Sequence, residues 1–269
     1  NLHMLTSVNT IIEQQPYAYQ YINGQLTQVP CFFSVSGNTV TFNMPDGYDT
    51  SEELIIDPTL IFSTYTGATS DNWGFTATYD NTGHLYAGGA AFGVGYPTTT
   101  GAFQINFAGG DPVGPFFIDI SVSKFTPDGS NLIYSTYLGG SASTEIPQSM
   151  IVSPQNELIV YGTTGSVNFP TTPGCFDDSF NGGFSVTFNS MPYQSGPGSD
   201  IIVSKFNADG SALVGSTYIG GVGNDGLNLS TALKRNYADE ARGEVFIDAG
   251  GNIYLASSTN SPDFPATEG

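Results

Sequence analysis

Basic residues are scarce in this sequence. The 269 residues include 5 Lys and Arg against 24 Asp and Glu, which gives a formal net charge of −19. Nucleic acids and anionic lipid surfaces are bound through clustered Lys and Arg, so a surface this acidic argues against both kinds of partner. A well-solvated surface is the simplest consequence of the charge, and cation binding is the main alternative.

Long apolar runs and cysteines are also few. No run approaches the about 20 apolar residues that cross a bilayer as a helix, so the sequence predicts no membrane insertion. The two cysteines, Cys31 and Cys175, belong to different predicted units and have no metal-ligand spacing. Two free buried thiols and one long-range disulfide fit the sequence equally well.

The residue patterns of common catalytic sites are missing as well. The chain has two histidines, and it contains no Gly-x-Ser-x-Gly elbow, His-Glu-x-x-His motif or phosphate-binding glycine loop. Asp177 and Asp178 are adjacent carboxylates in a loop, whereas glycoside hydrolysis needs two carboxyl groups that face one bond. We therefore predict that the chain is not an enzyme and has no catalytic residues.

Glycine, proline and aromatic residues are plentiful instead. The chain has 34 Gly, 16 Pro, 19 Phe and 15 Tyr, and 11% of its residues are charged. This composition favours short strands joined by tight turns. A strand-like stretch that ends at glycine occurs three times, as Leu60-Ile-Phe-Ser-Thr-Tyr-Thr-Gly67, Leu132-Ile-Tyr-Ser-Thr-Tyr-Leu-Gly-Gly140 and Leu213-Val-Gly-Ser-Thr-Tyr-Ile-Gly-Gly221. Three near-copies of one strand indicate a repeat protein.

The Ser-Thr-Tyr stretches are followed by further motifs in a constant order. These are an apolar strand, a tight turn, a strand of the Asn252-Ile-Tyr-Leu-Ala256 type, an aromatic-Pro pair, a long loop, and a Val-Ser-Lys-Phe strand that leads into an Asp-Gly turn. Four antiparallel strands per tandem unit are typical of a β-propeller blade. We therefore predict an all-β chain in which residues 54–269 form four-stranded antiparallel blades, with units at about 54–116, 117–198 and 199–269 and the long loops between blades.

Three units are fewer than the four to eight blades of closed propellers. The sequence therefore predicts an incomplete propeller and a chain that is a piece of a longer protein. The third unit also carries an extra stretch at about 226–241, for which we predict a short surface helix.

Residues 1–53 lack the repeat motifs. Strand patterns at Ala18–Ile22, Val29–Val35 and Thr39–Asn43 are separated by the hairpin signals Asn23-Gly24 and Ser36-Gly-Asn38. This segment is predicted to be a small β meander at the end of a preceding β-rich domain.

Together these motifs resemble the SBBP ("seven-bladed beta-propeller") repeat. The matching residues are Ser-Thr-Tyr-Leu-Gly-Gly, Asp-x-x-Gly-Asn-Ile-Tyr, Phe-Pro-Thr-Thr-x-Gly and Asp-x-x-x-Ser-Lys-Phe, and the segment from Pro16 to Pro58 resembles the β-rich domain that precedes such repeats. The resemblance implies an exported, extracellular or cell-surface protein of the Bacteroidetes type, in which a type IX secretion system is common. It implies no shared catalytic residues.

Loop aromatics are the candidate binding residues, because long loops on a rigid scaffold commonly carry binding. Tyr65, Tyr137 and Tyr218 recur at one repeat position and are predicted to pack between blades. The aromatics that do not recur are candidates for a partner or glycan surface: Phe107, Phe116, Phe180, Phe184, Phe188 and Tyr193.

Acidic turn residues are the weak candidates for a metal site. Asp71, Asp128, Asp209 and Asp225 lie in turns and offer the oxygen ligands that Ca²⁺ prefers. None fits a spaced calcium-binding loop, and Asp-Gly is mainly turn chemistry, so structural turns without a cofactor are the favoured interpretation.

The sequence thus predicts a non-catalytic interaction or adhesion module whose partners are other proteins or surface glycans, with the secretion machinery as a further partner. The alternative is a carbohydrate- or calcium-binding module of an extracellular enzyme whose catalytic part lies outside this chain.

Overall fold

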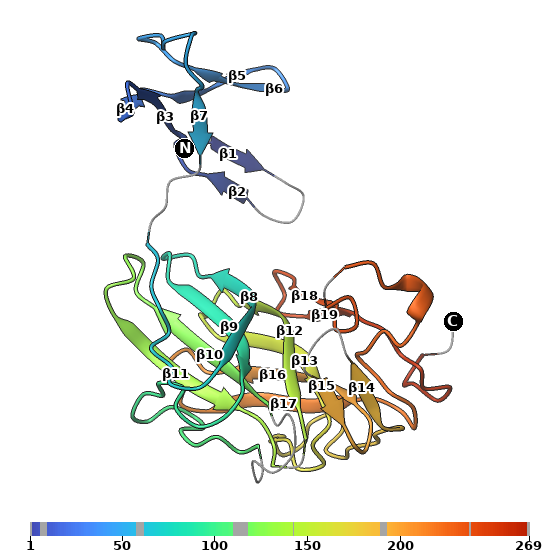
Figure 1. Ribbon diagram of the computed structural model, residues 1–269. Helices are drawn as coiled ribbons and strands as arrows, with labels where there is room; N and C mark the ends of the chain where they lie inside the picture. Colours follow the sequence, from blue (N-terminus) through green and yellow to red (C-terminus); the bar gives the residue numbers. More distant parts are fainter. Residues whose placement is uncertain are drawn as a thin grey trace. The chain divides into compact units, whose positions relative to one another are not determined.

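The structure is a computed structural model that describes residues 2–5, 10–57, 62–109, 118–141, 143–188, 193–236 and 238–267. It divides into two compact units, Asn1–Ser63 and Thr64–Gly269 (Figure 1). The division lies later than the predicted boundary at residue 53, because β7 (Ile55–Asp57) pairs with β3 (Tyr17–Ile22) of the first unit. In the described residues the regular structure is β-strand apart from one short 3₁₀ turn, so the all-β prediction is confirmed.

The first unit consists of small antiparallel sheets. The strands β1 (Leu2–Leu5) and β2 (Thr10–Glu13) form one hairpin. A second sheet has the order β4-β3-β7, with β4 at Gln25–Val29, and β5 (Phe32–Ser36) pairs with β6 (Thr39–Asn43). The predicted hairpin turns are present, and Asn23 and Gly24 adopt the positive φ angles, 52° and 78°, that such a turn requires.

The second unit contains two four-stranded antiparallel sheets in which each strand pairs with the next strand of its own sheet along the chain. One holds β8 (Asn72–Tyr79), β9 (Leu85–Ala91), β10 (Asp119–Phe125) and β11 (Leu132–Leu138). The other holds β12 (Glu145–Val152), β13 (Leu158–Thr164), β16 (Asp200–Phe206) and β17 (Leu213–Ile219).

Two further pairs of strands complete the described sheets. The hairpin β18 (Glu244–Ile247) and β19 (Ile253–Ala256) repeats the pairing of β8 with β9 and of β12 with β13. The short strands β14 (Val186–Phe188) and β15 (Tyr193–Ser195) form the other pair. The extra stretch of the third unit forms a single 3₁₀ turn, Thr231–Leu233, where a surface helix was predicted.

Each long loop connects two strands of the same four-stranded sheet and does not separate one sheet from the next. Residues 92–118 connect β9 to β10, and residues 165–199 connect β13 to β16. The predicted unit boundaries at 116/117 and 198/199 are therefore wrong, since each would divide strands that form one hydrogen-bonded ladder. Lengthening a flexible loop adds little to the entropic cost of closing it, so two strands can pair across a long loop. Hydrogen bonding between strands therefore decides which strands share a sheet.

These loops cover the outer edge of each sheet. The backbone N–H of Thr99 donates to the carbonyl of Ser135 at 3.0 Å, and that of Tyr137 donates to the carbonyl of Gln104 at 2.9 Å. Thr172 makes the equivalent bond to β17 at 3.0 Å. The loop after the aromatic-Pro pair thus occupies edge positions that would otherwise be open to another strand.

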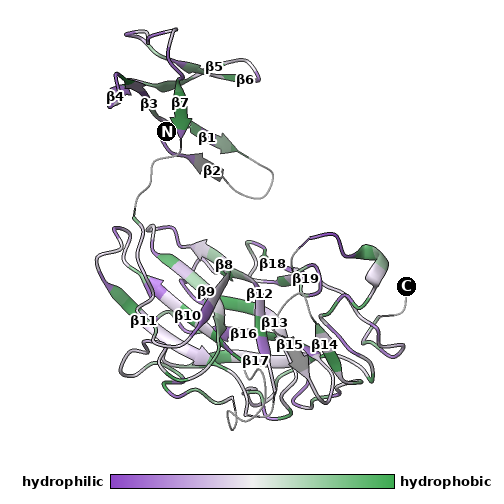
Figure 2. Ribbon diagram, viewed as in Figure 1, coloured by the Kyte–Doolittle hydropathy of each residue, from purple (hydrophilic) through white to green (hydrophobic). Residues whose placement is uncertain are grey.

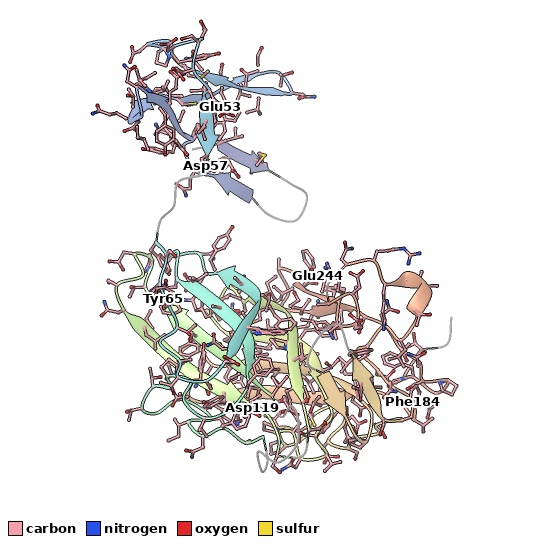
Figure 3. The ribbon with its side chains drawn as sticks, viewed as in Figure 1. Glu53, Asp57, Tyr65, Asp119, Phe184 and Glu244 are labelled. Atoms are coloured by element: carbon pink, nitrogen blue, oxygen red, sulfur yellow. The ribbon has the colours of Figure 1, made fainter. Side chains whose placement is uncertain are left out.

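The described part of the first Ser-Thr-Tyr stretch, from residue 62 onward, is not a strand. Residues 62–68 have no regular secondary structure, and the side chain of Tyr65 is 96% exposed. Tyr65 is labelled at the surface of the unit in Figure 3. Tyr137 and Tyr218, in contrast, are buried. In the other two copies a preceding Val-Ser-Lys-Phe strand pairs with the stretch, and the first copy has no such sequence before it. The packing prediction is therefore wrong for Tyr65, and Ser63 is not equivalent to Ser135.

The main core lies between the two four-stranded sheets. Its largest fully buried side chains include Tyr86, Ile120, Leu138, Phe206 and Tyr218. Hydrophobic and hydrophilic residues both occur along the strands around it (Figure 2). Cys31, in the first unit, is a buried thiol, and Cys175, in the second unit, is a half-buried thiol. In the described part of the chain, no helix has the length and apolarity needed to cross a membrane.

Candidate functional site

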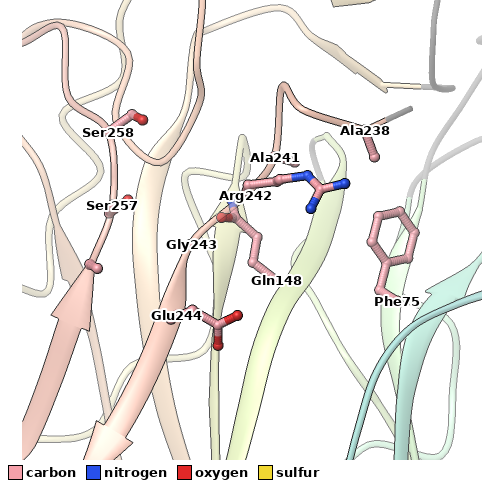
Figure 4. Close-up of a pocket in the computed structure, with 10 residues that line it drawn as sticks. Phe75, Gln148, Ala238, Ala241, Arg242, Gly243, Glu244, Ser257 and Ser258 are labelled. Carbon is pink, nitrogen blue, oxygen red and sulfur yellow. The ribbon is translucent and has the colours of Figure 1, made fainter. Parts of the chain in front are cut away.

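An open groove lies where the first strands of successive sheets meet. Strand β12 contacts both β8 and β18 there. The larger hollow has a volume of about 610 Å³ (Figure 4). Its lining includes Phe75, Gln148, Arg242, Glu244 and Ser257. An adjoining hollow of about 470 Å³ shares Phe75 and Arg242 and adds Trp73. We call the surface formed by these six residues the inner-strand groove.

Two of the lining residues sit at equivalent β-bulges. The pairing of β8 with β9 shifts between Gly74 and Thr76, at Phe75, and that of β12 with β13 shifts between Pro147 and Ser149, at Gln148. A bulge redirects a side chain relative to the alternating pattern of the strand. The repeat therefore places a bulged side chain in the groove from each of two neighbouring sheets (Figure 4).

The uncharged polar groups of the groove are held by hydrogen bonds. Gln148 Nε2 donates to the carbonyl of Gly226 at 2.8 Å. The Tyr161 hydroxyl lies 3.1 Å from Gln148 Oε1 and 2.6 Å from Ser257 Oγ. Burial raises the pKa of Tyr161, so its hydroxyl stays protonated and links Gln148 on β12 to Ser257, which follows β19.

The charged groups are also oriented. Arg242 Nε lies 2.9 Å from Asp239 Oδ1, and the Arg242 side chain is largely exposed. Backbone N–H groups of Arg235 and Asn236 lower the pKa of Asp239, which favours the carboxylate that holds the guanidinium. Glu244 Oε2 accepts a hydrogen bond from the Ser149 hydroxyl at 2.8 Å. The groove therefore presents one cation and one anion in defined positions.

Trp73 is the only tryptophan of the chain and is 40% exposed. Its ring lies 5.3 Å from the ring of Phe92, measured between centroids, at an interplanar angle of 58°. On β8 it pairs with Ala90, whose small side chain offers little cover. A large ring left partly open beside polar groups is a common feature of binding sites. Sequence reasoning missed this site because most of the groove residues lie on strands, whereas the candidates were chosen from loops.

Two of the predicted binding aromatics pack inside the unit. The ring of Phe107 lies 5.7 Å from that of Tyr137, and the ring of Phe180 lies 6.0 Å from that of Tyr218. Both are partly buried, and each contacts the tyrosine of its Ser-Thr-Tyr strand. They occupy equivalent repeat positions, so the prediction that they do not recur is wrong. The sequence did carry the signal, since each phenylalanine lies 11 residues after the aromatic residue of its aromatic-Pro pair (96 to 107 and 169 to 180).

The other predicted aromatics are not gathered into one surface. Phe184 is 61% exposed and lies at the margin of the unit (Figure 3). Phe188 is half-buried beneath Lys234 Nζ, which lies 4.5 Å from the ring centroid. Tyr193 begins β15, and its side chain lies outside the described structure. Phe116 lies outside the described residues.

The weak metal candidates are likewise not brought together. Asp71 is exposed, and the carboxylates of Asp128 and Asp209 accept hydrogen bonds from the serine two residues later, as in Asx turns. Within the described ranges, no three His, Cys, Asp or Glu side chains form a group suited to a metal ion. Asp225, the fourth candidate, is fully buried.

Asp225 belongs instead to a buried carboxyl pair between sheets. Asp225 Oδ2 accepts hydrogen bonds from the Gly221 N–H and the Ser261 hydroxyl at 2.8 and 2.7 Å. Asp200 accepts from the backbone N–H groups of Asn181 and Gly182 at 2.7 and 3.1 Å. Because burial opposes ionisation, the pKa of Asp200 is raised to about 7.

The same pair recurs one repeat earlier. Asp119 accepts from the backbone N–H groups of Ala108 and Gly109, and Glu145 accepts from the Thr164 hydroxyl at 2.7 Å. Burial raises the pKa of both carboxyl groups. Most of these oxygens accept from N–H and O–H donors, which suits a structural joint better than a cation site; among the described residues, Glu145 Oε2 has no hydrogen-bond partner. The recurring Asp at the start of each Val-Ser-Lys-Phe strand was the available sequence signal.

Comparison with protein families gives a match in the first unit. A family model described as Domain of unknown function (DUF7948) matches residues 1–59. No curated protein matches the chain.

Proposed function

We propose that this chain is a non-catalytic interaction module of an exported protein, acting at the cell surface or in the extracellular space. The observation that carries the proposal is the inner-strand groove, which combines the chain's exposed tryptophan with an oriented cation and an oriented anion. The polar groups of the groove are already engaged with the scaffold, as expected for a preformed recognition surface. The acidic surface agrees with a partner that is not nucleic acid.

The scaffold of this module is, in our proposal, a β-propeller of the SBBP type. Three features support it: two four-stranded antiparallel sheets that follow one another in sequence, a further hairpin with the same pairing as their first two strands, and equivalent buried carboxyl pairs between successive sheets. In this arrangement the first strand of each sheet faces a common axis, where the groove lies. The first unit is the end of the β-rich domain that precedes the repeats.

The SBBP resemblance also supports export by a type IX-like pathway and partners that are proteins or surface glycans. The mixture of an aromatic ring with hydrogen-bonding groups favours one second candidate. In it, the chain is a carbohydrate-binding module, with or without Ca²⁺, attached to an extracellular enzyme whose catalytic part lies elsewhere.

The test is a binding measurement with a catalytic counter-assay. The labelled chain is applied to a glycan array and to intact cells, with Ca²⁺ and with a chelator, and is assayed in parallel against panels of glycosidase, esterase and peptidase substrates. Saturable binding without turnover is the expected result. Turnover that co-purifies with the chain and is lost on mutating groove residues would overturn the non-catalytic assignment.

A further inference from the structure

Building on the proposed function, we infer that the inner-strand groove binds a neutral oligosaccharide. In this inference Trp73 provides the surface on which a sugar ring stacks, and Arg242 and Glu244 bind its hydroxyl groups.

The tryptophan supplies the stacking surface. A pyranose ring has an apolar face of C–H groups and a rim of hydroxyls, so it fits a partly exposed aromatic ring that is bordered by polar groups. Trp73 is 40% exposed and is supported from within the unit by Phe92, at 5.3 Å between ring centroids. Covering the indole with a sugar face would remove apolar surface from water without moving the strand.

The charged residues supply complementary hydrogen bonds. A sugar hydroxyl both donates and accepts, while an arginine only donates and a carboxylate only accepts. Arg242 is held by Asp239 at 2.9 Å, and Glu244 is held by Ser149 at 2.8 Å. Because these side chains are already ordered, binding a ligand costs less side-chain entropy than it would with free ones.

The charge balance selects a neutral saccharide. The groove carries Arg242 and Glu244 on its lining, with Asp239 beside the guanidinium, so it has no excess of positive charge. The chain as a whole carries −19, which disfavours an approaching polyanion at low ionic strength.

The form of the groove favours a saccharide over an extended peptide. Peptides that add to a sheet need a regular free edge, and β8 is interrupted by the bulge at Phe75. A hollow of about 610 Å³ is within the usual range for organic ligands and much larger than an ion requires.

The single tryptophan makes the inference directly testable. The intact chain is titrated with cellohexaose, mannohexaose and xylohexaose, and with hexagalacturonate as the acidic counterpart, while the emission of Trp73 is followed. We expect a saturable change with at least one neutral hexasaccharide and a markedly weaker response to hexagalacturonate. By calorimetry, Trp73→Ala should weaken binding at least about tenfold, and Glu244→Gln should weaken it several-fold.

The matched control is Tyr79→Ala, an equivalent truncation on the same strand. Tyr79 is 71% exposed and does not line the groove, so its loss should leave affinity unchanged. Thermal melts of all variants separate lost binding from lost folding.

Binding to none of the neutral sugars would overturn the inference, as would neutral-sugar binding that survives Trp73→Ala or a preference for the acidic sugar. Emission changes with extended peptides alone would assign the groove to peptides. If intact cells bind the Trp73→Ala variant as well as the unmodified chain, the interaction module stands and the groove assignment fails.

Discussion

Raising the pH from about 4.5 to about 8 is expected to lower the stability of this protein, whereas the stability of proteins is usually greatest between about pH 5 and 8. The cause is the buried carboxyl pair of Asp200 and Asp225. The pKa of Asp200 is raised to about 7 by burial, with the nearby carboxylates of Asp225 and Asp177 acting in the same direction. Between about pH 4 and 7 the folded state therefore holds a proton that the unfolded state has released.

The sign and size follow from proton linkage. A folded state that binds more protons than the unfolded state loses stability as the pH rises, until both states are deprotonated. A shift from about 4 to about 7 at about 1.4 kcal/mol per pKa unit corresponds to about 4 kcal/mol for Asp200. For a unit of this size, that is a fall of about 10 °C in melting temperature. The pair of Asp119 and Glu145 acts in the same direction, because burial also raises their pKa values.

A second group of carboxylates sets the lower limit of the stable range. The Thr126 hydroxyl and the Ser130 N–H lower the pKa of Asp128 to about 2. Its contribution is present above the unfolded value near 4 and is lost as the pH falls through about 2. Maximum stability is therefore expected at about pH 4–5.

The assay is calorimetric melting of the full chain at intervals from about pH 4 to about pH 8, with Asp200→Asn and Asp178→Asn variants. Both substitutions remove one negative charge, but Asp178 is exposed in a loop. Asp200→Asn should flatten the decline above pH 5, whereas Asp178→Asn should keep the full slope. The slopes are compared, because the amide replaces one oxygen that accepts a backbone N–H and so lowers the melting temperature of Asp200→Asn at every pH. Parallel pH profiles for all three proteins would refute the reasoning.

Three further outcomes are expected. Gly220→Ala should cost about 1–3 kcal/mol by chemical denaturation, since its new Cβ would lie 2.6 Å from Asp200 Oδ1. Gly215→Ala, within the strand that ends at Ile219 just before Gly220, meets no atom within 4 Å and should be neutral or stabilising. Equal effects would contradict the packing. Tyr218→Phe should lower the free energy of unfolding by about 1–3 kcal/mol, because the Tyr218 hydroxyl forms hydrogen bonds with backbone groups at 2.8 and 2.9 Å. The control Tyr65→Phe, at a 96% exposed site, should leave the stability unchanged. A loss of stability in both variants would contradict a specific role of the Tyr218 hydroxyl. A chelator should leave the melting temperature unchanged, because the Asp-Gly turns are closed by their own hydrogen bonds; a fall of many degrees would reveal a structural cation.

Much of the local structure could be predicted from the sequence. Asn23-Gly24 and the glycines of the two Asp-Gly turns adopt positive φ, with 68° at Gly129 and 71° at Gly210, because these residues tolerate that backbone region. The alternating strands around Tyr134 and Ser204 form where expected. These turns and strands depend on residues that are close together in the sequence, so the local sequence pattern is sufficient to predict them.

The grouping of strands and the candidate site could not be predicted in this way. The long loops were expected to separate sheets, yet β9 pairs with β10 across one of them. The inner-strand groove joins Trp73 to Arg242, far apart in sequence, through the packing of β8, β12 and β18. Contacts of this kind depend on which strands meet, and the local pattern does not specify that.

The Ser-Thr-Tyr stretches show the division most clearly. Their central three residues are identical in all copies, and each alternates as a strand should. Tyr137 and Tyr218 are buried, with hydroxyls bonded to backbone, while Tyr65 is exposed. The sequence by itself determined that these segments can be strands. Only the tertiary structure decided which ones are, because a strand forms where a partner strand supplies hydrogen bonds and a core covers its apolar side chains.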